Sequence, residues 1–404
     1  MNLNLLEKLN DKQKEAASQI DGSILILAGA GSGKTRTITY RIAHMIENVG
    51  ISPYSILAVT FTNKAAKEMR ERVEELVGDI AKACTISTFH SFGMRLLRMY
   101  AKEVGYNSNF TIYDTDDQKR MVKAILKGQN LSLNGVKLTE RDIVSMISKI
   151  KEQIKTLDEY SVMNKQIVEV YDKYNRVLLE SNAMDFSDIL LNTYKLLQKP
   201  EILEKVQNKY KYIMIDEYQD TNNLQYKIID LIARKSSNLC VVGDENQSIY
   251  GFRGANILNI LNFETNYNNA KIIKLEENYR STTTILDAAN ELIKNNKSSK
   301  DKKLWTQNGK GDLIKVLACD NARDEVSRII EIIKENHQNG IAYRDMTILY
   351  RTNAQSRVFE EGLLRYSIPH KVFGGISFYS RAEIKDIIAY LSIIVNPQDE
   401  LNLQ

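Results

Sequence analysis

Apolar residues near the start of the chain follow two alternating patterns. Short, mostly apolar runs occupy 23–28 and 56–61, and each precedes a stretch with helical spacing, 35–49 and 63–77. An apolar run without alternation is typical of a strand buried on both faces, as in a parallel sheet between helices. The strand–helix alternation therefore predicts an α/β fold with a parallel sheet. The sheet is predicted to continue at 212–216, 239–243 and 271–275.

The pattern changes after the first hundred residues. Helical, charged segments dominate 105–184, so we expect a helical domain there, inserted into an α/β domain formed by 1–104 and 185–274. A second α/β pattern predicts a partial domain at 275–376, and 377–404 resembles the start of another inserted helical domain. The elements expected in the partial domain are helices at 282–295, 321–337 and 354–366 and strands at 312–318 and 346–351.

Size, charge and cysteine content limit the number of domains, the kind of partner and the cellular compartment that we expect. A chain of 404 residues is too long for one ordinary core, and its net charge of +4 permits a nucleic-acid partner without requiring one. Cys84, Cys240 and Cys319 have neither metal-ligand spacing nor the even number of a disulfide framework, which indicates a reducing, cytoplasmic compartment. The N-terminal residues lack a signal-peptide pattern, and no apolar run is long enough to span a bilayer, so no membrane partner is expected.

Residues 28–35, AGAGSGKT, form a glycine-rich pattern between a predicted strand and a predicted helix. This context is typical of a phosphate-binding loop, whose backbone N–H groups surround phosphate oxygens at a helix N-terminus. Lys34 is expected to hold the β- and γ-phosphates and Thr35 to bind Mg²⁺. The alternative is a chance glycine-rich turn. The residues expected to contact nucleotide are Ala28, Gly29, Ala30, Gly31, Ser32, Gly33, Lys34 and Thr35.

Two adjacent acids, Asp216 and Glu217, follow the predicted strand 212–216. Neighbouring residues of a regular strand point to opposite faces, so the two carboxylates are expected to have different roles. In a phosphate-loop fold, Asp216 is predicted to hold Mg²⁺, and Glu217 to orient or deprotonate an attacking water. A solvated acidic turn is the alternative. If both acids act, they favour hydrolysis over transfer of a phosphoryl group to another substrate.

Further segments occur in a specific order: LNDKQKEA at 9–16, TFTNKAAKEMRER at 60–72, STFHSF at 87–92, DEYQDT at 216–221, VVGDENQSIYGFRGA at 241–255, KLEENYRS at 274–281 and YRTNAQSR at 350–357. With the phosphate loop, they make the chain closely resemble superfamily 1 DNA helicases of the UvrD/PcrA/Rep type over nearly its whole length. This resemblance implies two P-loop, RecA-like motor domains with parallel sheets, the first carrying the inserted helical domain. It also implies ATP-driven movement 3′ to 5′ along single-stranded DNA.

The resemblance assigns roles around the nucleotide. It implies that Gln13 reads the adenine edge and that Arg36 is a further nucleotide-site arginine. Gln247 matches the sensor of the γ-phosphate that links hydrolysis to the DNA site. Tyr279 matches the residue that stacks on the base, and Arg280 the arginine finger that reaches the γ-phosphate from the second motor domain. The implied ligands are ATP and Mg²⁺.

Aromatic residues beside basic and small polar ones are typical of single-stranded DNA binding, because bases stack on rings with little sequence preference. Ordinary core packing is the alternative for each ring. Phe252 stands where close relatives usually carry Trp, which reduces the stacking area. The lysine-rich stretch 294–303 is expected to be a DNA-phosphate contact or a solvated loop, and Trp305 a packing or rim residue. The candidate DNA-binding residues are Phe61, Asn63, Lys64, Thr88, His90, Phe186, Tyr250, Phe252 and Arg253.

Segments that such helicases carry further along, including a glutamate-containing one and a second arginine finger, are not found up to residue 404. We therefore expect a fragment that, by itself, binds ATP–Mg²⁺ and DNA weakly and hydrolyses ATP poorly. Single-stranded DNA and single/double-strand junctions are the expected partners, in repair or replication. Two alternatives stay open: a nucleotide-gated DNA-binding module without motor activity, and the motor part of a helicase–nuclease repair complex. A P-loop kinase would not explain the aromatic segments.

Overall fold

The computed structural model describes residues 5–128, 131–133, 136–153, 165–296, 300, 302–373 and 382–403. The chain divides into two compact units, one formed by 1–312 with 392–404 and the other by 313–391. Residues 275–312, which the sequence pattern assigns to the second α/β domain, belong to the first unit, together with the phosphate loop.

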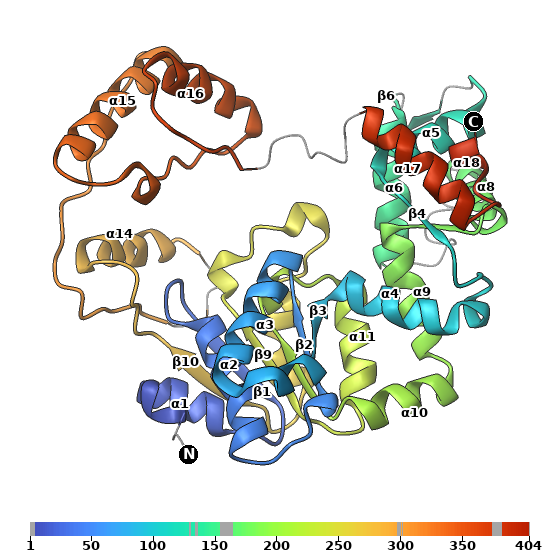
Figure 1. Ribbon diagram of the computed structural model, residues 1–404, viewed down its shortest axis with the longest axis horizontal. Coiled ribbons are helices and arrows are strands. Elements are labelled where there is room, and N and C mark those ends of the chain that lie inside the picture. The colour runs from blue at the N-terminus through green and yellow to red at the C-terminus, as the bar shows by residue number, and fades with distance from the viewer. Residues whose placement is uncertain are drawn as a thin grey trace. The chain divides into compact units, whose positions relative to one another are not determined.

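A six-stranded parallel sheet forms the centre of the first unit, in the order β10-β1-β9-β8-β2-β3 (Figure 1). The predicted α/β fold with a parallel sheet is confirmed. The central strand β1 pairs with β9 on one side and β10 on the other, so that Ile26 lies beside both Val242 and Ile273. The strands are β1 Ile24–Ala28, β2 Ile56–Thr60, β3 Thr85–Thr88, β8 Tyr212–Ile215, β9 Leu239–Gly243 and β10 Lys271–Leu275.

The inner strands are almost entirely apolar, as expected for a sheet that helices cover on both faces. Alternate residues of β1 enter different cores: Leu25 and Leu27 one, Ile24 and Ile26 the other. The second core is closed by α1 Asp11–Ser18, α2 Lys34–Glu47 and α3 Asn63–Val77. The first is closed by α4 Phe89–Tyr100, α9 Phe186–Leu197, α10 Pro200–Lys209, α11 Asn223–Ala233, α12 Leu258–Leu261 and α13 Phe263–Asn266. Helix α14 Thr283–Ile293 follows β10.

Short 3₁₀ turns join several of these elements. They are η1 Leu5–Lys8, η2 Pro53–Ser55, η3 Gly78–Ala83, η4 Ala101–Val104, η5 Tyr218–Asp220, η6 Glu245–Gln247 and η7 Gly251–Arg253. Two of them matter for function, because η5 follows β8 and η6 follows β9 at the same edge of the sheet. The carboxyl ends of parallel strands are where α/β folds bind ligands.

The predicted helical insertion contains α5 Thr115–Leu126, α6 Glu140–Gln153 and α8 Lys165–Glu180, with the paired strands β4 Thr111–Tyr113 and β7 Ala183–Asp185 and the short pair β5 Ser132–Leu133 and β6 Val136–Lys137. These elements have their own core, which includes Tyr113, Ile147, Tyr174 and Leu178.

Residues 392–403 pack against this insertion. The buried Asn396 side chain donates hydrogen bonds to the backbone carbonyls of Ser181 and Asn182, at 2.9 and 3.0 Å. The Tyr113 hydroxyl donates to the Asp399 carboxylate at 2.6 Å. The segment, which holds the end of α17 Ala382–Val395 and α18 Glu400–Leu403, is thus part of the first unit.

The second unit contains α15 Ala322–Gln338, η8 Tyr343–Asp345 and α16 Asn353–Arg365, whose buried faces meet through Ile330 and Leu363. The strands predicted at 312–318 and 346–351 are wrong, because no strand is present there. Strands are stabilised by hydrogen bonds to neighbouring strands, and within the described part of 313–373 no such neighbour exists. Val316 accordingly leaves 91% of its surface exposed.

Candidate functional site

The glycine-rich loop leads from β1 directly into α2. Gly33 is the N-cap of α2 with a φ of +83°, a conformation that residues with a side chain rarely adopt. A Cβ at this position would lie 2.7 Å from Nε2 of Gln13. Glycine at position 33 therefore leaves the helix N-terminus open and lets Gln13 come close.

Gln13 is buried against this loop. Its Nε2 donates to the carbonyl of Ser32 at 3.0 Å, and its Oε1 accepts from the backbone N–H of Asn10 at 3.2 Å. The Asn10 side chain caps α1 in return, accepting from the Gln13 N–H at 2.8 Å. On the outer side of the loop, Arg36 donates to the carbonyl of Lys8 at 2.7 Å and lies 5.4 Å from the Tyr40 ring centre.

The two adjacent acids lie at the carboxyl end of β8, where the strand has already ended. Glu217 has a left-handed backbone with a φ of +50°, and its Oε2 lies 3.4 Å from Nζ of Lys34. The Asp216 carboxylate accepts the backbone N–H of Glu217 at 3.0 Å. Alternation along a regular strand therefore does not apply to this pair.

Negative charge is concentrated beside Lys34. Burial, with the nearby charge of Glu217, raises the pKa of Asp216 to about 7 against the opposing effect of Lys34. Burial and Glu217 also raise the pKa of Asp220 to about 6. Among the described residues, Asp220 Oδ1 is a buried oxygen without a hydrogen-bond partner. Such a surplus of carboxylate oxygen beside a phosphate loop suits a divalent cation.

A side-chain network joins the ends of β8 and β9. Gln219 donates to Glu217 Oε2 at 2.9 Å and accepts the backbone N–H of Asp244 at 2.9 Å. The Gln247 amide donates to Asp244 Oδ2 at 2.6 Å. The sensor candidate Gln247 is thus connected to Lys34 through three residues. The sequence reasoning missed Gln219 and Asp244, although both lie inside the segments that carried the resemblance.

Residues 278–280 lie directly over the phosphate loop. The Asn278 side-chain amide donates to the carbonyl of Ala30 at 2.6 Å, and the backbone N–H of Tyr279 donates to the carbonyl of Gly31 at 2.9 Å. Arg280 is exposed at this edge, beside the loop that it was expected to approach from a second domain. Asn278 is buried and was also missed by the sequence reasoning.

Aromatic side chains gather beyond the end of β2. Phe61 stacks on Tyr250 with ring centres 5.2 Å apart, and Tyr250 and Phe252 are 6.0 Å apart. The Arg253 guanidinium lies 5.1 Å from the Tyr250 ring centre and 5.5 Å from that of Phe252. Phe252 exposes 69% of its surface, and Phe186 50%, so core packing does not account for either ring.

Beside this group lies a hollow of about 510 Å³. His90 meets Phe186 edge to face in its wall at 6.1 Å, and burial lowers the pKa of His90 below its usual value. Lys64 does not line the hollow and pairs with Glu68 at 3.8 Å. The residues that line it are Phe61, Thr62, Asn63, Thr88, His90, Ser91, Met94, Phe186 and Ile189, of which Thr62, Ser91, Met94 and Ile189 were not predicted.

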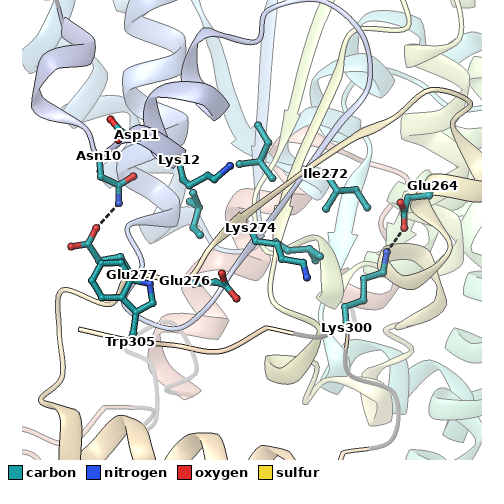
Figure 2. Close-up of a pocket in the computed structure, with 13 residues that line it drawn as sticks. Asn10, Asp11, Lys12, Glu264, Ile272, Lys274, Glu276, Glu277, Lys300 and Trp305 are labelled. Atoms are coloured by element: carbon teal, nitrogen blue, oxygen red, sulfur yellow. Dashed lines mark hydrogen bonds and ion pairs between the residues drawn. The ribbon is translucent and has the colours of Figure 1, made fainter. Parts of the chain in front are cut away.

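A second hollow, of about 930 Å³, follows the outer edge of β10. Figure 2 shows Asn10 directed to Glu277 and Lys300 to Glu264, at 2.9 and 2.8 Å. Trp305 lies on its rim, in keeping with one of the two positions expected for it. Lys302, by contrast, is buried, so neither alternative for the lysine-rich stretch describes this residue.

Comparison with known proteins identifies the family. The UvrD/REP helicase N-terminal domain matches residues 9–268, and the UvrD-like helicase C-terminal domain matches 273–404. The chain belongs to the UvrD/REP helicase family. The resemblance inferred from the motifs is therefore confirmed.

Two members of the UvrD/REP family illustrate the degree of similarity. Both are named ATP-dependent DNA helicase PcrA: one from Staphylococcus aureus (strain Mu50) is 49% identical over 409 aligned residues, and one from Staphylococcus epidermidis (strain RP62A) is 47% identical over 406. Each alignment covers 99% of this chain and 55% of the relative, so the chain spans about half the length of these curated proteins. None of the helices in the described residues has the length and apolarity needed to cross a membrane.

Proposed function

We propose that this chain forms the motor of an ATP-dependent DNA helicase, which moves 3′ to 5′ along single-stranded DNA. The observation that carries the proposal is the path from Lys34 through Glu217, Gln219 and Asp244 to Gln247. Gln247 ends η6, three residues before Tyr250, so a change at the phosphates has a short route to the aromatic surface. The names of the two relatives support the activity, and the family resemblance alone supports the direction.

In this proposal the nucleotide lies across the carboxyl edge of the sheet. Its phosphates occupy the loop 28–35, with Lys34 on the β- and γ-phosphates, and Gln13 and Tyr279 flank the base. Arg36 and Arg280 supply positive charge at the rim. Arg280 then stabilises the γ-phosphate in the transition state, as arginine fingers do.

Hydrolysis requires a cation and an oriented water. Thr35 and Asp216 would hold Mg²⁺, which neutralises charge that develops on the phosphates. Within the described residues no group of three His, Cys, Asp or Glu side chains is placed to hold a metal ion. Glu217, held by Gln219, accepts the proton of the attacking water.

The DNA strand is proposed to cross the aromatic surface. Bases stack on Phe61, Tyr250 and Phe252 and enter the hollow between His90 and Phe186, at about 1–3 kcal/mol for each stacked base. The strand's polar groups are bound by residues at the same surface: Asn63 and Thr88 through hydrogen bonds, and Lys64 and Arg253 through phosphates. Junctions between single- and double-stranded DNA are the proposed substrates, with a role in repair or replication.

Titration and turnover measurements on the purified chain test this proposal. We expect it to bind a fluorescent ATP analogue with Mg²⁺ and to hydrolyse ATP slowly, at a rate that rises severalfold with single-stranded DNA. Glu217→Gln should bind nucleotide within about twofold of the wild type and lose turnover by about 10²-fold or more. The matched control is Lys67→Ala, which alters only an exposed pair with Glu71. Turnover that survives Lys34→Ala would overturn the proposal.

The same measurements separate the alternatives. A DNA affinity that changes with bound nucleotide, in the absence of any turnover, would favour a nucleotide-gated binding module. Displacement of streptavidin from the 5′ end of a biotinylated strand, and not from the 3′ end, would support 3′ to 5′ movement. The described residues contain no carboxylate cluster that supports a nuclease.

A further inference from the structure

One buried lysine outside the predicted site faces the loop that carries Gln247. Lys302, in the segment after α14, exposes only 3% of its side chain. Its Nζ lies 2.6 Å from Asp244 Oδ1 and 3.3 Å from Glu245 Oε2, and both carboxylates are buried. Burying these charges is costly unless they compensate one another. Lys302 must therefore stay paired with Asp244 and Glu245 for these three side chains to remain buried.

Asp244 uses its two oxygens for different partners. Oδ1 accepts from Lys302 at 2.6 Å and from the backbone N–H of Asn246 at 3.1 Å, and Oδ2 accepts from the Gln247 amide at 2.6 Å. The backbone N–H of Asp244 is bound by Gln219 as well. The orientation of this carboxylate, and with it the position of the Gln247 side chain, is therefore set by groups on both sides.

The segment that carries Lys302 also reaches the phosphate loop. A Cβ added at Gly29 would overlap the side chain of Leu304, so the two are in close contact. The side-chain amide of Asn290, on α14, accepts the backbone N–H of Leu304 at 3.2 Å and donates to the Leu304 carbonyl at 2.9 Å. Residues 302–304 thus connect the first glycine of the phosphate loop with the loop that follows β9.

We propose that Lys302 is a positioning residue for nucleotide sensing, which holds the Gln247 amide in place for the terminal phosphate through Asp244. The inference rests on the proposed function and extends it to a residue outside the motifs. Without the lysine, Asp244 and Glu245 lose the cation that faces both, and Asp244 Oδ1 keeps only the backbone N–H of Asn246 among its described partners, so the carboxylate is held less firmly. Gln247 then loses the fixed acceptor that orients it. The consequence is specific for ATP, because ADP lacks the γ-phosphate that Gln247 is proposed to contact.

The test is the ratio of affinities for a non-hydrolysable ATP analogue and for ADP, measured by titration on the full chain. Lys302→Met should lower affinity for the analogue on the order of tenfold, as for a lost hydrogen bond to a charged group, and leave ADP affinity within about twofold. Lys302→Arg, which keeps the charge, should restore most of the ratio. Lys300→Met is the matched control, because Lys300 is two residues away and pairs with Glu264 in the hollow of Figure 2.

A double-mutant cycle distinguishes positioning from a general structural role. If Lys302 acts through Gln247, the double variant Lys302→Met/Gln247→Ala should discriminate ATP from ADP no worse than Gln247→Ala alone. Should Lys302→Met fail to fold, Lys302→Gln provides the same comparison, with a donor but no charge. Equal loss of ATP and ADP affinity, or additive losses, would overturn the inference. A wild-type chain that binds neither nucleotide would instead overturn the proposed function.

Discussion

Two buried lysines serve the same unit of this protein in different ways. Lys151, at the end of α6, is fully buried with Nζ 2.8 Å from both Asp185 and Asp188. Lys302 faces its two carboxylates at 2.6 and 3.3 Å. The two clusters differ in the other groups that their carboxylates bind. Those of the first cluster are used within the fold, whereas Asp244 in the second also holds the amide of a nucleotide-sensing candidate.

The Lys151 cluster attaches the helical insertion to the α/β part of the first unit, because Lys151 lies on α6 and Asp188 on α9. Asp185 caps α9 by accepting the Asp188 N–H at 2.8 Å and also accepts the Tyr174 hydroxyl at 3.0 Å. Burial raises the pKa of Asp188 to about 6, while Lys151 holds the pKa of Asp185 below its ordinary value. Phe186 follows immediately and lines the hollow beside the aromatic surface. Similar ion clusters are thus connected differently: one joins elements of the fold, and the other also holds the Gln247 amide.

The largest expected effect is the loss of Lys151. Lys151→Met leaves Asp185 and Asp188 buried without their cation and should lower the free energy of unfolding by about 3–5 kcal/mol. Urea unfolding measures this change. Lys149→Met, an exposed change on the same helix, should stay within about 0.5 kcal/mol of the wild type. A loss below about 1 kcal/mol for Lys151→Met would show that the cluster does not secure the insertion.

The nucleotide-site carboxylates should give the next largest effect, through pH. The pKa of Asp216 is about 7 in the folded chain against an ordinary value of 3.8, so between these values the folded state keeps a proton that the unfolded state releases. Stability is therefore highest at low pH in this window and falls as pH rises, by about 2–3 kcal/mol from pH 5 to pH 8 for this group. Asp216→Asn should remove that part of the slope in urea unfolding. An unchanged slope would contradict the raised pKa.

Phe186 sharpens the comparison on the DNA side. Phe186→Ala removes an exposed ring from the hollow and should weaken binding of single-stranded DNA by about 1–3 kcal/mol. Its nucleotide affinity should not change, unlike that of Lys302→Met. Fluorescence anisotropy with a labelled oligonucleotide measures the loss. Tyr54→Ala, which removes an exposed ring elsewhere, is the control and should bind DNA like the wild type.

The smallest expected effect concerns Phe252. Phe252→Trp enlarges the stacking face beside Tyr250 and Arg253 and should strengthen DNA binding only a few-fold. The same anisotropy assay detects the change. Weaker binding by the Trp variant would indicate that this surface is shaped for the smaller ring.

Local pattern predicted some parts of this structure and not others. The glycine-rich loop between β1 and α2 and five of the six parallel strands follow from glycine spacing and apolar runs, because each is encoded by neighbouring residues; β3 was not predicted. The left-handed backbone conformation of Glu217 depends on tertiary contacts and does not follow from the alternation of residues along a strand. The apolar stretches at 312–318 and 346–351 look like strands but lack a neighbour to pair with in the described part of the second unit. The pairing of Lys302 with Asp244 could not be predicted from local pattern, because Asp244 lies 58 residues earlier in the chain.

In the proposed function, the glycine-rich loop and the aromatic surface respond to each other. The most direct measurement is the affinity of the chain for single-stranded DNA when loaded with a non-hydrolysable ATP analogue and when loaded with ADP. We expect the two affinities to differ by at least about threefold in the wild type, and the difference to disappear in Gln247→Ala. Equal affinities in both nucleotide states, with both nucleotides shown to be bound, would contradict it.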